Sequence, residues 1–126
     1  MIFGIGTDIV EYARIESMWQ RYQTRLAERM LSADELPEYC AHAHPARFLA
    51  KRFAAKEAFA KAVGSGIRHP VSLTLISVTH DGLGKPVLKF DPVLRTYLAQ
   101  IGVSGHHLSI SDEQSMVVAF VVLETN

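Results

Sequence analysis

Segment 48–67, FLAKRFAAKEAFAKAVGSGI, is largely apolar but carries one carboxylate, Glu57, among several basic side chains. Its apolar spacing predicts a mostly buried helix, on which Lys61 lies one turn after Glu57 and Arg52 and Lys56 flank that face. One interpretation is a surface ion pair, worth about 0.2–0.5 kcal/mol. The other follows from the narrow polar stripe, because a partly buried carboxylate needs a cationic partner or a metal ion.

A second carboxylate, Asp8, lies in the opening segment IFGIGTDIV, whose alternating pattern predicts a buried strand. In a strand, Gly4, Gly6 and Asp8 share one face. The two glycines leave space beside the carboxylate, as expected where a ligand or another backbone comes close. The simpler alternative is that Asp8 ends the strand and accepts backbone hydrogen bonds in a turn.

Two carboxylates from distant segments, with lysines nearby, suit a hard divalent cation that holds a phosphate-bearing substrate. Mg²⁺ takes one or two carboxylates and completes its octahedron with phosphate oxygens and water. The residues therefore allow a Mg²⁺ site at Asp8 and Glu57. Structural ion pairs cluster in the same way, so this alternative remains equally open.

Gly64, Ser65 and Gly66 follow the predicted helix rather than precede it, which distinguishes them from a Walker loop. Glycine in this place is typical of a helix C-cap in the left-handed conformation. A phosphate bound here would meet the unfavourable end of the helix dipole. Lys56, Lys61 or a metal ion would have to offset that effect.

Residues 12–31 are expected to form one amphipathic helix with basic residues on one side. Arg14, Arg21 and Arg25 lie one to two turns apart, with the apolar Met18 and Trp19 beside them. Such a stripe is usually a solvated face. It could also receive an acidic helical partner.

The overall composition excludes several classes of function. Thirteen basic and thirteen acidic residues cancel, so no global field favours nucleic acid or a membrane surface. One cysteine, Cys40, and six histidines without a helical His-x-x-x-His pair do not predict a closed zinc site. With no possible internal disulfide, no basic and apolar signal segment and no apolar run near the roughly 20 residues of a membrane span, we expect a cytoplasmic protein.

The elements that must position these residues follow from periodicity and turn signals. Beyond the opening strand and the two long helices, "SADE" (32–35) has capping-box spacing ahead of a short helix, and "HAHPA" (42–46) forms a loop. Further strands are expected at 71–78, 86–90, 106–111 and 116–124, with a helix over 92–102. This order predicts a single α+β domain, residues 1–126, with a largely antiparallel sheet packed against helices that include a long central one.

Two of these segments together resemble a known family. "GIGTDIVEYARI" and "FLAKRFAAKEAFAKAVGSGI" are similar to the two signatures of the bacterial holo-acyl-carrier-protein synthases, which are 4'-phosphopantetheinyl transferases. The resemblance runs from end to end and includes "DGLGKP" and the closing "LSIS…AFVVLE". It implies the 4'-phosphopantetheinyl transferase fold.

The resemblance implies a Mg²⁺-dependent transfer of phosphopantetheine from coenzyme A to a serine of apo acyl carrier protein, for fatty acid biosynthesis. The other product is adenosine 3',5'-bisphosphate. In the family pattern, the residues matching Asp8 and Glu57 bind Mg²⁺, and the one matching Lys61 contacts the phosphates. The attacking serine needs a base, for which Glu57 acting through a metal-bound water and a metal-bound hydroxide are both open.

The family pattern also implies further contacts. The carrier-docking stripe corresponds to Arg14, Met18, Arg21 and Arg25, and relatives form homotrimers with active sites between subunits. After "SIS", where many members have a nucleotide-binding histidine, this chain has Asp112. The residues expected to bind coenzyme A are Arg47 (3'-phosphate), Arg52, Lys56, Lys61, Gly64, Ser65 and Gly66.

Two other classes of function are weighed against this enzyme. A non-catalytic module that binds coenzyme A or carrier protein predicts the loss of a metal-ligand carboxylate, and both Asp8 and Glu57 are present. An RNA-binding domain that uses the arginine helix is disfavoured by the neutral charge and the lack of stacking motifs.

Overall fold

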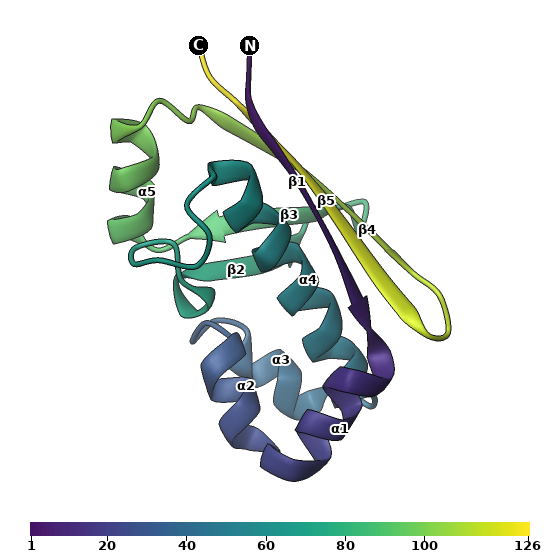
Figure 1. The fold of residues 1–126 in the computed structure, drawn as a ribbon. Helices are drawn as coiled ribbons and strands as arrows, with labels where there is room; N and C mark the ends of the chain where they lie inside the picture. The colour runs from purple at the N-terminus through teal and green to yellow at the C-terminus, as the bar shows by residue number, and fades with distance from the viewer.

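The computed structural model describes residues 1–126, with helices and strands in one mixed domain (Figure 1). All strand pairs are antiparallel, in a three-stranded sheet of order β1-β5-β4 and a separate β2-β3 hairpin. The elements are β1 (Ile2–Glu11), α1 (Tyr12–Tyr22), α2 (Thr24–Met30), α3 (Leu36–Ala41), α4 (Pro45–Val63), a 3-10 turn η1 (Leu73–Leu75), β2 (Ile76–His80), β3 (Pro86–Phe90), α5 (Pro92–Gln100), β4 (Gly105–Asp112) and β5 (Met116–Glu124). The predicted α+β class with a long central helix is confirmed.

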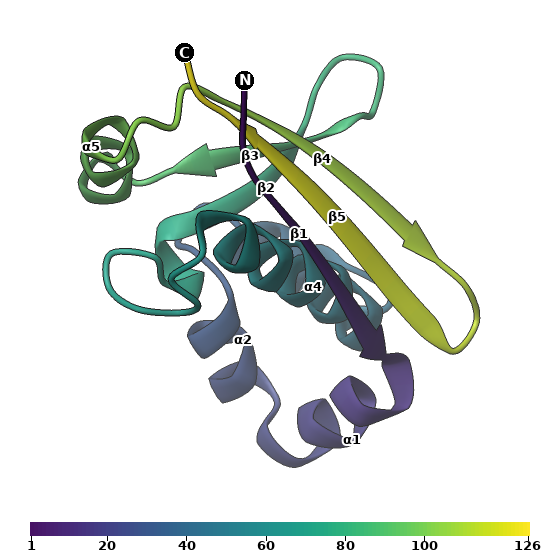
Figure 2. The ribbon, with the colours of Figure 1, turned by 45° about the horizontal axis from the view of Figure 1, so that its top comes forward.

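Helix α4 runs through the middle of the molecule, between the three-stranded sheet and the β2-β3 hairpin (Figures 1 and 2). It begins at Pro45, whose missing N–H costs nothing in the first turn, and ends before Gly64, which has a φ of 92°. Most of its residues are buried, and many of those are alanines that let neighbouring elements approach. The helix is therefore the core element to which the other layers attach.

Two glycines allow β1 to lie directly on α4. A Cβ atom at Gly4 would overlap the carbonyl oxygen of Ala62, and one at Gly6 would overlap that of Ala58. The sequence predicted that either a ligand or another backbone comes close to these glycines, and in the structure it is the backbone of α4. Asp8 follows on the same face of β1 and is carried toward the last turns of α4.

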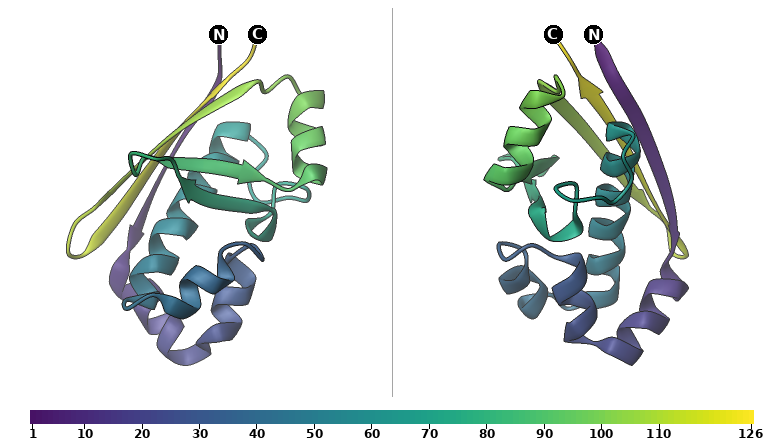
Figure 3. Two further views of the ribbon diagram at one scale, coloured as in Figure 1. Left: turned by 180° about the vertical axis from the view of Figure 1, so that it is seen from behind. Right: turned by 60° about the vertical axis from the view of Figure 1, so that its left-hand side comes forward.

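The opposite face of the three-stranded sheet carries no covering element (Figure 3). Ile5 and Ile9 on β1 are 58% and 62% exposed, and Phe120 on β5 is 41% exposed. The prediction of a buried opening strand is therefore correct for the face toward α4 and wrong for the other face of the isolated chain. At one end of this sheet the chain termini lie side by side, where Met1 N donates to Thr125 O over 2.8 Å.

A side chain joins the hairpin to the larger sheet. The backbone N–H of Leu88 on β3 donates to Nε2 of His106 on β4 over 3.1 Å, and the His106 ring packs edge-on against Phe90. Burial lowers the pKa of His106, which keeps the ring neutral and able to accept this bond. Phe90 also contacts Phe59 of α4, with ring centroids 4.9 Å apart, so the hairpin is fixed to both layers.

The predicted single helix over residues 12–31 is wrong in one respect, because it breaks at Gln23. Gln23 has a φ of 50°, and its N–H donates to the carbonyl of Trp19 to close α1 before α2 begins. Trp19 Nε1 donates to the hydroxyl of Tyr39, which holds α1 against α3. The break turns the second half of the basic stripe relative to the first.

The predicted strand over 71–78 is shorter than expected. Its first half forms η1, in which Leu75 N donates locally to the Ser72 carbonyl, and only Ile76–His80 pairs with β3. Apolar alternation alone cannot distinguish such a turn from a strand. No helix of the structure is long and apolar enough to span a membrane.

We predict that Gly6→Ala lowers the free energy of unfolding by at least about 2 kcal/mol, because the added methyl group overlaps backbone atoms of α4 that cannot move alone. Urea denaturation followed by circular dichroism measures the change. Gly82→Ala is the matched control, since nothing lies within 4 Å of its Cβ position, and it should change stability by less than about 0.5 kcal/mol. Equal stability of the two variants would contradict the close approach of β1 and α4.

Candidate active site

Asp8 of β1 and Lys61 of α4 meet where the strand crosses the end of the helix. Lys61 Nζ donates to the Asp8 carboxylate over 3.1 Å and to the Thr7 carbonyl over 3.0 Å. The Asp8 side chain is only 14% exposed, whereas that of Lys61 is 53% exposed. The two residues, predicted from separate segments, therefore lie together with the lysine at the solvent side.

Glu57 lies one helical turn before Lys61 and completes this cluster. Burial raises the pKa of Glu57, the neighbouring carboxylate of Asp8 raises it further, and Lys61 lowers it. Two carboxylates are thus held close enough to repel one another, and Lys61 is the one cation that acts on both. Asp8 lies within β1 rather than at its end, and Lys61 pairs with Asp8 rather than with Glu57, so neither the turn nor the surface-pair interpretation is confirmed. A shared cation site stays a prediction.

This donor set fits a divalent cation with few protein ligands. The structure contains no group of three or more His, Cys, Asp or Glu residues that could hold a metal. A metal ion at Asp8 and Glu57 would therefore take two carboxylates from the chain and its remaining ligands from substrate and water. That is the arrangement Mg²⁺ favours when it is bound with a phosphate ligand.

The loop that begins at Gly64 leaves α4 from the same end. Gly64 and Gly66 have φ angles of 92° and 67°, and Gly64 N donates to the Ala60 carbonyl, so the C-cap interpretation is confirmed. The Ser65 hydroxyl donates to the carbonyl of Gly66. The loop therefore lies beyond Lys61 at the end of α4.

The prediction that Lys56 contacts a phosphate is wrong, because its side chain is completely buried. Lys56 Nζ donates to the Glu35 carboxylate over 2.5 Å and to the carbonyls of Met30 and Leu73. Burial lowers its pKa to about 8, although Glu35 acts in the opposite direction. Residue spacing placed Lys56 correctly beside Glu57 along the helix but could not show that it points inward.

Arg47 and Arg52, two other predicted coenzyme A ligands, lie at a pocket of about 300 Å³ on another side of α4. Arg52 stacks on Phe48 with its guanidinium 3.7 Å from the ring centre and pairs with Glu38 and Glu35. Basic and hairpin residues supply most of the remaining lining. The lining comprises Glu38, His42, Arg47, Phe48, Lys51, Arg52, Val78, His80, Gly84, Pro86 and Ile110.

Arg47 also holds the β4-β5 turn in place. Its two terminal nitrogens donate to the carbonyls of Glu113 and Gln114, each over 2.8 Å, and its guanidinium lies 4.1 Å from the centre of the Tyr12 ring. Asp112 lies 3.6 Å from both Arg47 and Lys51. The acid found where many relatives carry histidine is thus paired with basic residues at the rim of this pocket.

The predicted coenzyme A ligands therefore fall into two separate places on one chain. None of Asp8, Glu57, Lys61 or the 64–66 loop lines the Arg47–Arg52 pocket. Arg47 and Lys61 are fourteen residues apart, or about 21 Å along a helix axis. One chain does not bring the two groups together around a single small ligand.

The predicted docking stripe borders a groove of about 380 Å³ between α1 and α2. Met18 and Arg25 line it as expected, together with Tyr22, Leu26 and Arg29. Arg21 and Arg25 both lie against the Tyr22 ring, with guanidinium carbons 5.3 and 5.8 Å from its centre. Arg29 was missed, although it follows Arg25 by one helical turn.

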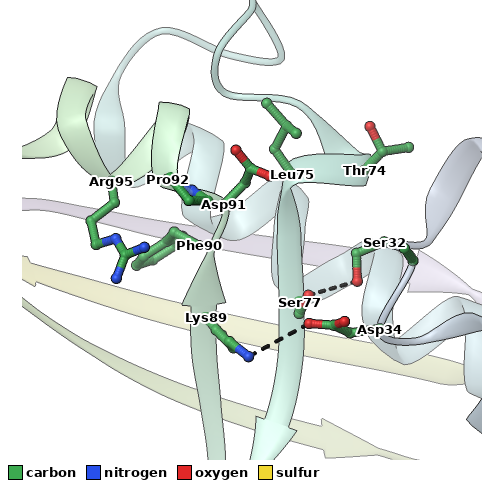
Figure 4. A pocket seen from close by; sticks show the side chains of 11 residues that line it. Ser32, Asp34, Thr74, Leu75, Ser77, Lys89, Phe90, Asp91, Pro92 and Arg95 are labelled. Carbon is green, nitrogen blue, oxygen red and sulfur yellow. Dashed lines mark hydrogen bonds and ion pairs between the residues drawn. The ribbon is translucent and has the colours of Figure 1, made fainter.

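Another hollow, of about 370 Å³, lies between the α2–α3 turn and the start of α5 (Figure 4). The Ser32 and Ser77 hydroxyls bond to one another there over 2.6 Å, and Lys89 pairs with Asp34 over 3.6 Å. Only half of the predicted capping box forms: the Glu35 side chain accepts from Ser32 N, while the Ser32 hydroxyl bonds to Ser77. Sequence patterns did not identify this hollow.

Comparison with known proteins matches residues 4–121 to the 4'-phosphopantetheinyl transferase superfamily. A holo-[acyl-carrier-protein] synthase of Nitrosospira multiformis is 59% identical over 98% of this chain and 99% of its own. The crystal structure of the Neisseria meningitidis holo-[acyl-carrier-protein] synthase superposes with a TM-score of 0.96 at 50% identity, covering 99% of this chain and 100% of that one. A Bacillus anthracis holo-(acyl-carrier-protein) synthase, solved in complex with CoA (3',5'-ADP), gives a TM-score of 0.82 at 40% identity over 100% and 99% of the two chains.

We predict that Glu57→Gln raises the melting temperature in the presence of a chelator by roughly 1–3 °C at pH 7, because it removes a half-buried charge beside Asp8. The folded-state pKa of Glu57 lies above its ordinary value of 4.5, so wild-type stability rises relative to the variant as the pH falls through that raised pKa. The advantage of the variant should therefore vanish near pH 4.

Melting curves of both proteins between pH 4 and 8 measure this difference. Glu28→Gln is the control, because Glu28 is exposed on α2 and makes no ion pair. A variant that melts below the wild type at pH 7 without metal would contradict the repulsion between the two carboxylates.

Proposed function

Because the chain belongs to the 4'-phosphopantetheinyl transferase superfamily, we propose that it transfers phosphopantetheine from coenzyme A to a serine of apo acyl carrier protein. The observation that carries the proposal is the cluster of Asp8, Glu57 and Lys61 where β1 crosses the end of α4. The reaction needs positioning and charge stabilisation more than a nucleophile on the enzyme. The exposed Lys61 supplies positive charge. The two carboxylates would hold a divalent cation that positions the diphosphate and offsets its charge.

In the proposed reaction, the serine oxygen of the carrier forms a bond to the phosphorus on the pantetheine side of the diphosphate. The bond from that phosphorus to the bridging oxygen breaks, and adenosine 3',5'-bisphosphate leaves with that oxygen. The serine proton passes to a base, and we propose the Glu57 carboxylate, acting through a water molecule, for that role. Lys61, with its exposed ammonium, stabilises the charge on the departing diphosphate oxygen.

Asp8 and Glu57 would hold Mg²⁺, which usually binds one or two carboxylates together with phosphate oxygens. When bound, Mg²⁺ offsets the negative charge of the diphosphate and orients it. In this arrangement Lys61 exchanges its bond with Asp8 for a contact with the phosphates. The 64–66 loop lies next to this position and would contribute backbone N–H groups.

The adenosine end of coenzyme A is proposed to occupy the pocket lined by Arg47, Lys51 and Arg52. The relative solved with coenzyme A supports a site for this ligand on the same fold. Because the pocket and the Asp8–Glu57 cluster lie apart on one chain, we propose that each active site combines the two places from neighbouring subunits of a homotrimer. The uncovered apolar face of the sheet supports that assembly, since monomers rarely expose such a patch.

The groove between α1 and α2 is proposed to receive the carrier. Arg25 and Arg29 line the groove beside the apolar Met18 and Leu26, which suits an acidic amphipathic helix. Arg14 and Arg21 of α1 do not line it and are proposed to extend the basic surface beside it. We assign the reaction to fatty acid biosynthesis in the cytoplasm. A module that binds carrier or coenzyme A without transfer has no need of two mutually repelling carboxylates beside a lysine.

The reaction is tested by intact-mass spectrometry of apo acyl carrier protein incubated with the protein and coenzyme A. We expect a mass gain of one phosphopantetheine group with Mg²⁺ and none with a chelator, because the diphosphate charge is then not offset. Asp8→Asn should lose the reaction and still fold. Carrier binding without any mass gain would contradict the proposed reaction and favour the non-catalytic module.

We predict that Phe120→Glu converts the assembly to monomers and lowers transfer at least about tenfold, because burying three like charges in a symmetric interface is unfavourable. Light scattering after size-exclusion chromatography measures the assembly, and melting curves check the fold. Val93→Glu, which places the same charge on an exposed apolar residue of α5, should remain a trimer. An active monomeric Phe120→Glu would contradict a site shared between subunits.

A further inference from the structure

A buried ionic network lies on the side of α4 away from β1. Lys56 and Glu35 are 0% and 2% exposed, and Arg52 Nε lies 3.4 Å from the second oxygen of the Glu35 carboxylate. That oxygen also accepts the backbone N–H of Val78 on β2, while the first accepts that of Ser32. Each Glu35 oxygen therefore keeps one backbone hydrogen bond even without Lys56.

Lys56, in contrast, bonds to two backbone carbonyls from separate segments, and one of them, that of Leu73, also accepts the N–H of Ile76. Its ammonium donates to the carbonyl of Met30, the last residue of α2, over 2.8 Å and to that of Leu73 over 2.9 Å. Carbonyls at the end of a helix lack partners within the helix and attract cations. One side chain thus connects α4 to the end of α2, which borders the groove proposed to receive the carrier (the carrier groove). It also connects α4 to Leu73, the first residue of η1, which follows the 64–72 loop.

The position of Lys56 in the chain gives these bonds a functional consequence. It directly precedes Glu57, and α2 contributes Leu26 and Arg29 to the groove. The 64–72 loop, whose return point Lys56 holds, begins with the glycines beside Lys61. The groove, the carboxylate and the loop are therefore all fixed relative to one buried ammonium group.

We propose that Lys56 is a positioning residue that aligns the carrier groove and the 64–72 loop with the Glu57 carboxylate. The inference rests on the proposed transfer reaction and adds a role that a buried residue performs without touching substrate. Misalignment of reacting groups by about 1 Å can lower a rate by as much as 100-fold. Loss of Lys56 should thus impair catalysis in a protein that still folds and still binds coenzyme A.

The test compares Glu35→Gln with the double variant Glu35→Gln/Lys56→Met. Glutamine keeps one of the two acceptor oxygens of residue 35, and the double variant avoids leaving a buried carboxylate without its cation. The single variant retains the bonds from Lys56 to Met30 and Leu73, whereas the double variant loses both. Lys89→Met is the matched control, because Lys89 is 67% exposed and lies outside the proposed site.

For the double variant we expect kcat to fall about 10- to 100-fold, and the KM for the carrier to rise more than the KM for coenzyme A. Glu35→Gln and Lys89→Met should keep kcat within about threefold. Circular dichroism and melting curves establish that each variant is folded. A folded double variant with wild-type kcat and carrier KM would overturn the proposal, as would equal losses in both KM values.

If methionine at position 56 prevents folding, Glu35→Gln/Lys56→Gln takes its place, since its amide can still donate to one carbonyl. We then expect a kcat that is lower than those of Glu35→Gln and Lys89→Met but by less than about tenfold. Unchanged kcat in that variant would overturn the proposal. Absence of transfer by the wild type as well would contradict the proposed function. That result can be told apart from failure of the Lys56 proposal, in which the wild type is active and the Lys56 variants match it.

Discussion

The direct contact of β1 with α4 is the constraint on which the rest of the site depends. At Gly4 and Gly6 the strand lies so close to the helix that no side chain fits between them. This contact carries Asp8 to the last turns of α4, where Glu57 and Lys61 lie. The repulsion between two carboxylates is therefore imposed by backbone packing, and the fold maintains an arrangement that isolated side chains would avoid.

The other side of α4 is held by charge instead of shape. Lys56 and Glu35 are buried together, and their bonds reach α2, η1 and β2. A buried ion pair contributes little net stability but strongly penalises the loss of one partner. Such a network specifies where the helix lies more than how firmly the protein is folded. Close backbone packing on one side and directed hydrogen bonds on the other leave α4 little freedom to rotate.

The sequence identified the acidic pair, the central helix and most strands, because those features depend on local periodicity and on residue type. It could not identify the break at Gln23, where a non-glycine residue adopts a φ of 50° without any local signal. It also assigned Lys56 to substrate, since a lysine next to a carboxylate looks the same whether it faces solvent or core. The inward orientation depends on Glu35, Met30 and Leu73, which are distant along the chain. The exposed side of β1 was missed because alternation does not reveal which faces a single chain covers.

The adjacent chain termini have a consequence for how this protein can be manipulated. Met1 and Thr125 exchange backbone hydrogen bonds at one end of the sheet, while β1 enters α1 at the other end (Figure 1). A peptide fused to either terminus therefore emerges at the same place, remote from the helices that form the groove. A short linker could also join the two ends, with new termini opened in the exposed turn at Gly82. Such a circular permutant would keep every strand pair while reversing the order in which the sheet and the central helix are synthesised.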